Sequence, residues 1–264
     1  MRILCLMVML ISWKASAATI ELVDVYSLAM QKQVRCMVVK PSGYSPSADP
    51  YPVLYLLHGW SGHFASWLAD APQLPDLADR YRMVVVCPDG GYDSWYLDSP
   101  VNPAVRYETF VSSELVQFVE YYYHVRCDTE GRFIAGLSMG GHGALYIALR
   151  SSGLFGAAAS LAGGLDLRPF RKNDWDLQGV LGDPKTHWRH WESASVCALL
   201  DSLPDVVPKL MIDCGTEDFF LPVNRNAHAK LKERQVPHTY RERPGGHDHL
   251  YWGEAINDVF EWLK

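Results

Sequence analysis

The chain has 264 residues, of which 48% are hydrophobic, and a formal net charge of −6 at pH 7. A chain of this length suits one large α/β domain, and its apolar content is enough for a sizeable core. No cluster of Lys and Arg stands out. Nucleic acid is therefore excluded as a partner, because neutralising phosphates requires grouped cations.

The first seventeen residues have the order of features found in a secretory signal. Arg2 supplies a positive start, Ile3 to Ile11 is a nearly unbroken apolar run, and Ala15-Ser16-Ala17 offers small residues for cleavage. The run is shorter than the roughly 20 residues that span a bilayer. We therefore expect a secreted or periplasmic protein with one domain, residues 18–264, and no stable membrane association. A buried N-terminal strand or helix is the alternative.

Five cysteines would remain after cleavage, so at least one is unpaired unless two chains are joined. Cys36, Cys87 and Cys214 lie in apolar runs typical of strands, where a cysteine is usually a small buried side chain. No spacing of Cys and His matches a structural zinc site. We expect neither a metal nor a cofactor.

Short β-branched runs alternate with helical patterns, as in a mostly parallel sheet with helices on both faces. They predict eight strands, at Ile20–Ser27, Val34–Val39, Val53–Leu57, Met83–Cys87, Arg132–Ala135, Gly156–Leu161, Leu210–Cys214 and Thr239–Arg241. Apolar spacing predicts helices at Thr109–Tyr122, Gly140–Arg150, Asn224–Gln235 and Ala255–Lys264. Residues 166–208 carry Trp175, Trp188 and Trp191 among many charges. This segment is either a cap-like insertion near the functional site or an ordinary surface excursion.

One strand–helix junction carries a catalytic motif. Gly136-Leu137-Ser138-Met139-Gly140 fits G-x-S-x-G, in which two glycines let strand and helix approach around a strained, accessible serine. An apolar run precedes the motif and a run of small residues follows it, which is the context that the motif requires. The sequence therefore predicts the α/β-hydrolase fold with Ser138 as nucleophile. An idle serine in a glycine-rich turn is the alternative.

A serine nucleophile needs a base and an acid that orients the base. In this fold the acid and then a histidine follow the serine along the chain. Glu217 and Asp218 come just after the strand Leu210–Cys214, where open α/β sheets collect catalytic groups. Asp213 lies inside the strand, and we expect it to make structural hydrogen bonds.

Four histidines follow these carboxylates. His228 lies in a predicted exposed helix, and His238 begins a predicted strand. His247 and His249 share the loop between the last strand and the last helix, from which a base can reach Ser138. We choose His247 as the base, and His249 is its rival.

Acyl transfer at a serine passes through a tetrahedral oxyanion that backbone N–H donors stabilise. Met139, which follows the nucleophile, should supply one donor. The other should come from the loop after the third strand, where the sequence reads Leu56-Leu57-His58-Gly59-Trp60. The sequence thus predicts the N–H of Trp60 as the second donor. Without a nucleophile, His58-Gly59 would be a plain turn after a strand.

Four segments together resemble the esterase branch of the α/β hydrolases. This branch includes feruloyl and acetyl xylan esterases, tributyrin esterases, S-formylglutathione hydrolases and the mycolyltransferase antigens. The segments are LLHG (Leu56–Gly59), GLSMGGHGAL (Gly136–Leu145), CGTED (Cys214–Asp218) and GGHDHLYW (Gly245–Trp252).

The resemblance assigns the nucleophile, acid and base to Ser138, Asp218 and His247, and the oxyanion donors to Trp60 and Met139. It also implies that Trp95 or Tyr96 lies near the substrate; burial as ordinary core aromatics is the alternative. S-formylglutathione hydrolases carry a D-H-S-Y-Y-F type segment. Residues 248–252 partly resemble it, and that alignment would make His249 the base.

These features predict a secreted serine esterase that acts on short-chain acyl or feruloyl esters, either small molecules or esters linked to a polysaccharide. An acyltransferase and an S-formylglutathione-type thioesterase are the enzymatic alternatives. A catalytically silent carbohydrate-binding protein is the alternative outside enzymes, although the presence of all three triad residues argues against it. The sequence does not define the acyl length, the alcohol or the oligomeric state.

Overall fold

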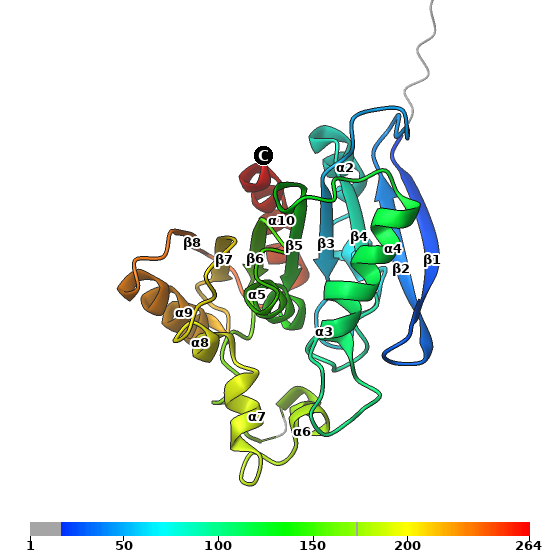
Figure 1. Ribbon diagram of the computed structural model, residues 1–264. Coiled ribbons are helices and arrows are strands. Elements are labelled where there is room, and N and C mark those ends of the chain that lie inside the picture. Colours follow the sequence, from blue (N-terminus) through cyan, green and yellow to red (C-terminus); the bar gives the residue numbers. More distant parts are fainter. Residues whose placement is uncertain (1–16, 173) are drawn as a thin grey trace, which may run out of the picture.

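The computed structural model describes residues 17–172 and 174–264. The predicted signal segment, except Ala17, lies outside the described residues. A single eight-stranded sheet crosses the domain in the order β1-β2-β4-β3-β5-β6-β7-β8 (Figure 1). β2 pairs antiparallel with both β1 and β4, and the other neighbours are parallel. The strands are β1 Thr19–Ser27, β2 Lys32–Lys40, β3 Val53–Leu57, β4 Val84–Pro88, β5 Arg132–Leu137, β6 Ala157–Leu161, β7 Lys209–Gly215 and β8 His238–Arg243.

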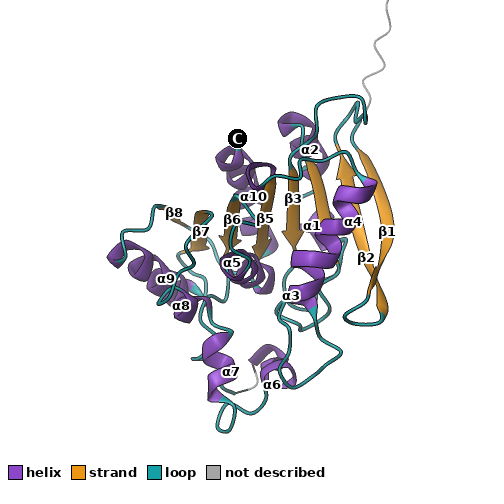
Figure 2. Cartoon of the chain, viewed as in Figure 1, coloured by secondary structure: helices purple, strands orange, loops and turns teal. Residues whose placement is uncertain are grey.

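Helices cover both faces of this sheet (Figure 2). One face carries α1 Ser66–Asp70, α2 Leu74–Tyr81 and α10 His249–Leu263. The other carries α3 Tyr107–Thr109, a π-turn at Phe110–Glu114, α4 Leu115–Tyr122, α5 Met139–Arg150, α8 Val196–Leu199 and α9 Leu221–Glu233. Short 3-10 turns lie at Thr129–Gly131 and Asp174–Asp176, and α6 Leu177–Leu181 and α7 Trp188–Ser193 lie between β6 and β7. None of the described helices is long and apolar enough to cross a membrane.

The central strands are buried on both sides. In β3, Tyr55 and Leu57 belong to the core beneath α5, whereas Leu54 and Leu56 belong to the core beneath α10. Successive side chains of a strand point to opposite faces. A continuous apolar run therefore requires cover on both faces, which is why these runs predicted the sheet correctly.

Local contacts explain where the helices differ from the prediction. α10 begins at His249, six residues before the predicted Ala255, because the side chain of Asp248 accepts a hydrogen bond from the N–H of Tyr251 at 2.9 Å. Such a cap satisfies a free donor of the first turn and fixes the start of the helix. α1 and α2 were not predicted. α1 has five residues, which is too short to show a helical period.

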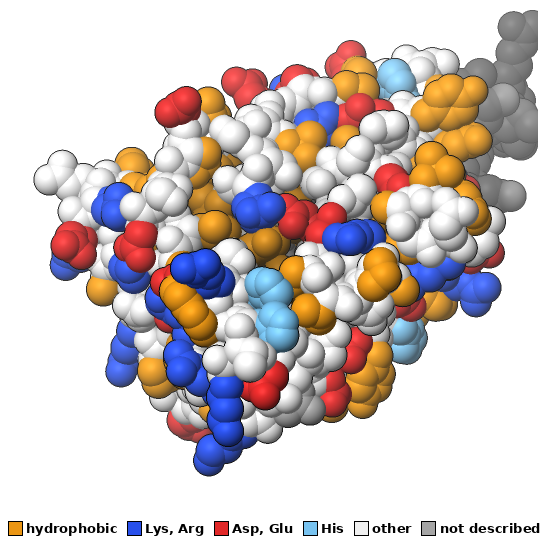
Figure 3. Space-filling model, turned by 60° about the horizontal axis from the view of Figure 1, so that its bottom comes forward, with side chains coloured by type: hydrophobic (Ala, Val, Ile, Leu, Met, Phe, Trp, Pro, Cys, Tyr) orange, Lys and Arg blue, Asp and Glu red, His pale blue; other side chains and the backbone are white. Residues whose placement is uncertain are grey.

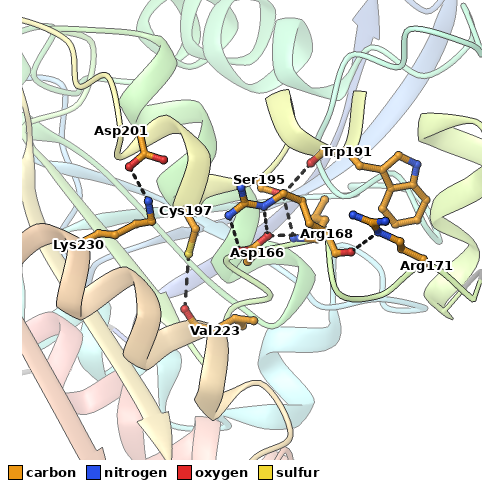
Figure 4. A network of polar contacts seen from close by, with 10 residues as sticks. Asp166, Arg168, Arg171, Trp191, Ser195, Cys197, Asp201, Val223 and Lys230 are labelled. Atoms are coloured by element: carbon orange, nitrogen blue, oxygen red, sulfur yellow. Dashed lines mark hydrogen bonds and ion pairs between the residues drawn. The ribbon is translucent and has the colours of Figure 1, made fainter. Parts of the chain in front are cut away.

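The connection between β6 and β7, for which the sequence left a cap-like insertion and a surface excursion open, lies past the carboxyl ends of the strands (Figure 1). Figure 4 shows the contacts that close it. The guanidinium of Arg168 pairs with the carboxylate of Asp166 at 2.7 Å. The hydroxyl of Ser195 accepts from the N–H of Leu167 at 3.0 Å and donates to the carbonyl of Trp191 at 2.7 Å. These contacts tie the first residues of the connection to its last turns.

No disulfide joins cysteines within the described part of the chain. Cys36, Cys87, Cys197 and Cys214 are buried, and Cys127 is exposed. Burial raises the pKa of the four buried thiols. They therefore stay protonated and behave as small apolar side chains, as the sequence predicted for three of them.

His142 lies one turn after Ser138 on α5 and is fully buried. Its Nε2 lies 2.8 Å from the carbonyl oxygen of Ala194, and its Nδ1 lies 3.2 Å from that of Trp95. Burial lowers the pKa of His142 to about 4, although both carbonyls oppose this shift. The neutral ring donates through its shorter contact, and so connects α5 to the end of α7.

We expect the free energy of unfolding to fall as the pH is lowered from about 6.5 to about 4. The unfolded chain protonates this histidine near 6.5 and the folded protein only near 4, so protons favour the unfolded state throughout that window. The full effect is on the order of 3 kcal/mol, since one pKa unit corresponds to about 1.4 kcal/mol. Urea unfolding across the window measures it.

The replacement His142→Gln should remove this part of the pH dependence. The matched replacement His187→Gln, at a histidine of the β6–β7 connection that is not fully buried, should keep it. Equal pH slopes in the wild type and His142→Gln would contradict the assignment.

Candidate active site

The turn between β5 and α5 holds Ser138 in a strained backbone conformation. Its φ of 54° and ψ of −118° lie outside the regions common for L-residues, at a cost of about 1–3 kcal/mol. A Cβ on Gly136 would lie 2.3 Å from the carbonyl oxygen of Gly140, and a Cβ on Gly140 would lie 2.3 Å from that of Leu57. Only glycine fits at either position, so the helix packs directly on β3 and lifts Ser138 above the sheet.

His247 lies between a hydroxyl and a carboxylate. Its Nε2 is 2.8 Å from Oγ of Ser138, and its Nδ1 is 2.7 Å from Oδ2 of Asp218. The other oxygen of Asp218 accepts from the N–H of Phe220 at 2.7 Å, which fixes the carboxylate. Ser138 and Asp218 are buried, and 14% of the His247 side chain is exposed. The loops after β5, β7 and β8 thus bring together the three residues that the sequence singled out.

The competing carboxylates are placed elsewhere. Glu217, next to Asp218, is exposed. Asp213 is fully buried in β7, where it pairs with the guanidinium of Arg243 and accepts from the hydroxyl of Tyr251. Asp213 therefore makes structural hydrogen bonds, as expected from its position inside the strand.

The competing histidines also have other partners. His228 on α9 and His238 on β8 contact each other at 2.7 Å. His249 lies in the first turn of α10, where its Nδ1 contacts the carboxylate of Asp70. Of the four histidines after Asp218, all within the described residues, His247 alone contacts the serine.

Two unpaired N–H groups lie next to the nucleophile. The loop after β3 comes so close that a Cβ on Gly59 would lie 3.4 Å from Cβ of Ser138. Within the described part of the chain, neither the N–H of Trp60 nor that of Met139 donates to an acceptor. Met139 begins α5, where the first N–H groups of a helix have no partner. Both groups predicted as oxyanion donors are thus available.

His58 holds the loop after β3 in place. The N–H of Gly90 donates to its Nε2 at 2.7 Å, so the ring proton is on Nδ1, which donates to the carbonyl of Gly59 at 2.7 Å. Burial lowers the pKa of His58, which keeps the ring neutral. The carbonyl of Gly59 and the N–H of Trp60 belong to one peptide group. His58 therefore sets the direction of the predicted oxyanion donor.

The sequence left two places open for Trp95 and Tyr96, near the substrate or buried among core aromatics, and the structure has them in the second. Both side chains are buried, and neither lines the cleft at Ser138. Both residues have positive φ, 53° and 56°. The hydroxyl of Tyr96 accepts from the N–H of His58 at 3.0 Å, and Trp95 packs edge-on against His142. They are core aromatics that support the site from behind.

The cleft at Ser138 has a volume of about 550 Å³. Aromatic side chains form part of its lining, and hydrogen-bonding groups form another part. The aromatic residues are Trp60, Trp175, Phe219 and Trp252, and the polar ones include His63, Ser66, Asp70, Asp248 and His249.

Sequence reasoning assigned no role at the site to Phe219 or Asp70. Phe219 directly follows the predicted acid, and its ring lies 4.3 Å from that of His247. Its position next to Asp218 was the one sequence feature that could have placed Phe219 at the site. Asp70 ends α1, and no local pattern marks it.

A second cavity of about 420 Å³ opens between α5, α7 and the segment around α3. Its charged groups already have partners. Arg150 pairs with Glu108 at 2.6 Å, and Asp98 accepts from the N–H of Thr109 at 3.0 Å. On the face shown in Figure 3, charged and histidine side chains gather around a hollow. Ser138 does not line this cavity, whereas it lines the first cleft.

The mostly parallel sheet and the strained serine at its strand–helix turn define the class of the protein. They are the features of an α/β hydrolase that uses a serine nucleophile. The model of the esterase family, described as "Putative esterase", matches residues 27–263. The chain belongs to this family and is a serine carboxylic-ester hydrolase.

Comparisons with individual proteins agree with this assignment. The chain is 30% identical to an acetyl esterase of Caldicellulosiruptor saccharolyticus over 228 residues, which cover 80% of this chain and 82% of that one. Its fold resembles that of FphF, a fluorophosphonate-binding serine hydrolase of Staphylococcus aureus, with a TM-score of 0.82 and 24% identity over 94% and 98% of the two chains. A ferulic acid esterase structure matches with a TM-score of 0.79 and 26% identity, over 94% and 98%.

We expect His58→Gln to lower kcat between tenfold and about 10³-fold, with a smaller change in KM. An oxyanion donor is worth about 10²–10³-fold, and the variant frees the peptide that carries it. Steady-state kinetics on a nitrophenyl ester measure the effect. The control is His124→Gln, because His124 also contacts a backbone carbonyl, that of Ala48 at 2.8 Å, but does not line the cleft. Equal kcat in a folded His58→Gln protein would show that His58 does not position the donor.

Proposed function

We propose that Ser138, His247 and Asp218 form a catalytic triad that hydrolyses carboxylic esters through an acyl-enzyme. One observation carries the proposal: His247 lies 2.8 Å from the serine hydroxyl and 2.7 Å from the carboxylate. The carboxylate accepts a hydrogen bond from Nδ1–H, which holds the proton on Nδ1 and leaves Nε2 unprotonated to accept the serine proton.

In the first step, Oγ of Ser138 attacks the ester carbonyl while Nε2 of His247 takes the hydroxyl proton. The tetrahedral oxyanion is stabilised by the N–H groups of Trp60 and Met139. When it collapses, the carbon–oxygen bond to the alcohol breaks, and the alcohol leaves with the proton from His247. The acyl group remains on Ser138.

In the second step, His247 removes a proton from water, which attacks the acyl-serine. The same two N–H groups stabilise the second oxyanion. Collapse releases the carboxylic acid and returns the proton to Ser138. All proton transfers in both steps use side chains of the chain itself.

The preferred substrates are short-chain acyl or feruloyl esters of carbohydrates. The names of the acetyl esterase and ferulic acid esterase relatives support this acyl range. The aromatic and polar lining of the cleft supports a carbohydrate as the alcohol part of the ester. Sugar rings stack on aromatic side chains, and sugar hydroxyls need hydrogen-bond partners. The order of charge, apolar run and small residues in the first seventeen positions supports secretion or periplasmic location.

Ser138→Ala should lower ester hydrolysis by on the order of 10⁴-fold or more, because no other group supplies the nucleophile. A panel of nitrophenyl esters, methyl ferulate and acetylated xylan measures this and ranks the acyl groups. Near wild-type activity in the variant would overturn the assignment of the nucleophile. A folded wild-type protein that cleaves no member of the panel would overturn the proposed substrate class.

Asp218→Asn should lower kcat by about 10⁴-fold, because an amide cannot hold the histidine in the tautomer that accepts the serine proton. Glu217→Gln is the matched control: it changes the neighbouring, exposed carboxylate in the same way and should retain activity. Comparable losses in both variants would exclude Asp218 as the specific acid.

A further inference from the structure

A second aspartate–histidine pair lines the same cleft. The carboxylate of Asp70, at the end of α1, contacts Nδ1 of His249 in the first turn of α10. The side chain of Asp70 is 7% exposed, whereas that of His249 is 77% exposed. Both residues line the cleft at Ser138.

A contribution to folding stability does not explain the pair of Asp70 and His249. Burying a carboxylate is unfavourable unless a cation or donors compensate it. Within the described residues, no Lys or Arg pairs with Asp70, and its ion-pair partner is the exposed His249. Burial raises the pKa of Asp70, and His249 opposes this shift. A nearly buried carboxylate that fixes an exposed ring in a cleft is a candidate for ligand binding.

Trp252 joins this pair to His247, the residue that protonates the departing alcohol in the proposed mechanism. The ring of Trp252 lies 4.9 Å from that of His247 and 5.6 Å from that of His249, perpendicular to both. In the proposed mechanism His247 gives its proton to the departing alcohol. The alcohol must therefore lie beside His247, and Trp252 connects that position to His249.

His249 and His63, which line the same cleft, offer a hydroxyl group both an acceptor and a donor. Because Asp70 engages Nδ1 of His249, Nε2 of that ring remains for a ligand. His63 accepts from the N–H of Ala65 through Nδ1 at 3.2 Å, which leaves its Nε2–H as a donor. A hydroxyl can both donate and accept, so it fits between such groups.

We propose that Asp70, His249 and His63 form a subsite that binds hydroxyl groups of the leaving alcohol. The enzyme would then select esters of sugars or related polyols over esters of simple alcohols. This inference rests on the proposed function and names the residues that recognise its alcohol. His249 is a specificity residue here, held by Asp70, and it does not replace His247 as base.

The test compares two esters of one acyl group, namely the group that the nitrophenyl panel ranks first. One is the ethyl ester, and the other is an ester of a monosaccharide with free neighbouring hydroxyls. In His249→Ala and Asp70→Asn we expect the ratio of kcat/KM, sugar ester over ethyl ester, to fall about tenfold, mainly through KM. His249→Gln, which keeps a hydrogen-bonding group, should recover part of the ratio.

Leu250→Ala is the matched control, because Leu250 neighbours His249 on α10, is 82% exposed and does not line the cleft. Its ratio should equal that of the wild type. An unchanged ratio in folded His249→Ala and Asp70→Asn, or a wild type without preference for the sugar ester, would overturn the subsite and leave the proposed hydrolysis intact. If Ser138→Ala still cleaved both esters, that result would instead overturn the proposed function.

Discussion

The close approach of α5 to β3 is the constraint on which the active site depends. Carbonyl groups fill the space where side chains of Gly136 and Gly140 would lie, and the helix can begin directly above the sheet only for that reason. The parallel strands end at one edge, so their loops meet there. His247 thus reaches Ser138 across 109 positions of the chain.

The sheet and the nucleophile could be predicted because each leaves a local pattern. Strands covered on both faces need continuous apolar runs, and the strained turn needs glycines at fixed spacing. The base could not be chosen from its loop alone, because His247 and His249 share it. The start of α10 separates them: Asp248 caps the helix, so His249 falls in the first turn and meets Asp70.

Other features depend on contacts between distant segments and leave no local pattern. An aromatic residue such as Tyr96 can face the cleft or the core, and the sequence around it does not distinguish the two orientations. Tyr96 faces inward because its hydroxyl meets the backbone of His58 at the end of β3. Asp70 gains its place in the cleft only when α1 packs beside α10. The structure of the β6–β7 connection could not be predicted either. Its ion pair between Arg168 and Asp166 involves two of many charged residues in that segment.

The thiols of the protein have a practical consequence for handling it. The described domain is held together by apolar packing and hydrogen bonds, with no covalent cross-link. Within that part of the chain, a reducing agent meets no disulfide to cleave. Cys127 is the exposed thiol of the described chain and precedes β5, whereas Ser138 follows that strand. A thiol-reactive probe on Cys127 would therefore attach near the opposite end of β5 from Ser138.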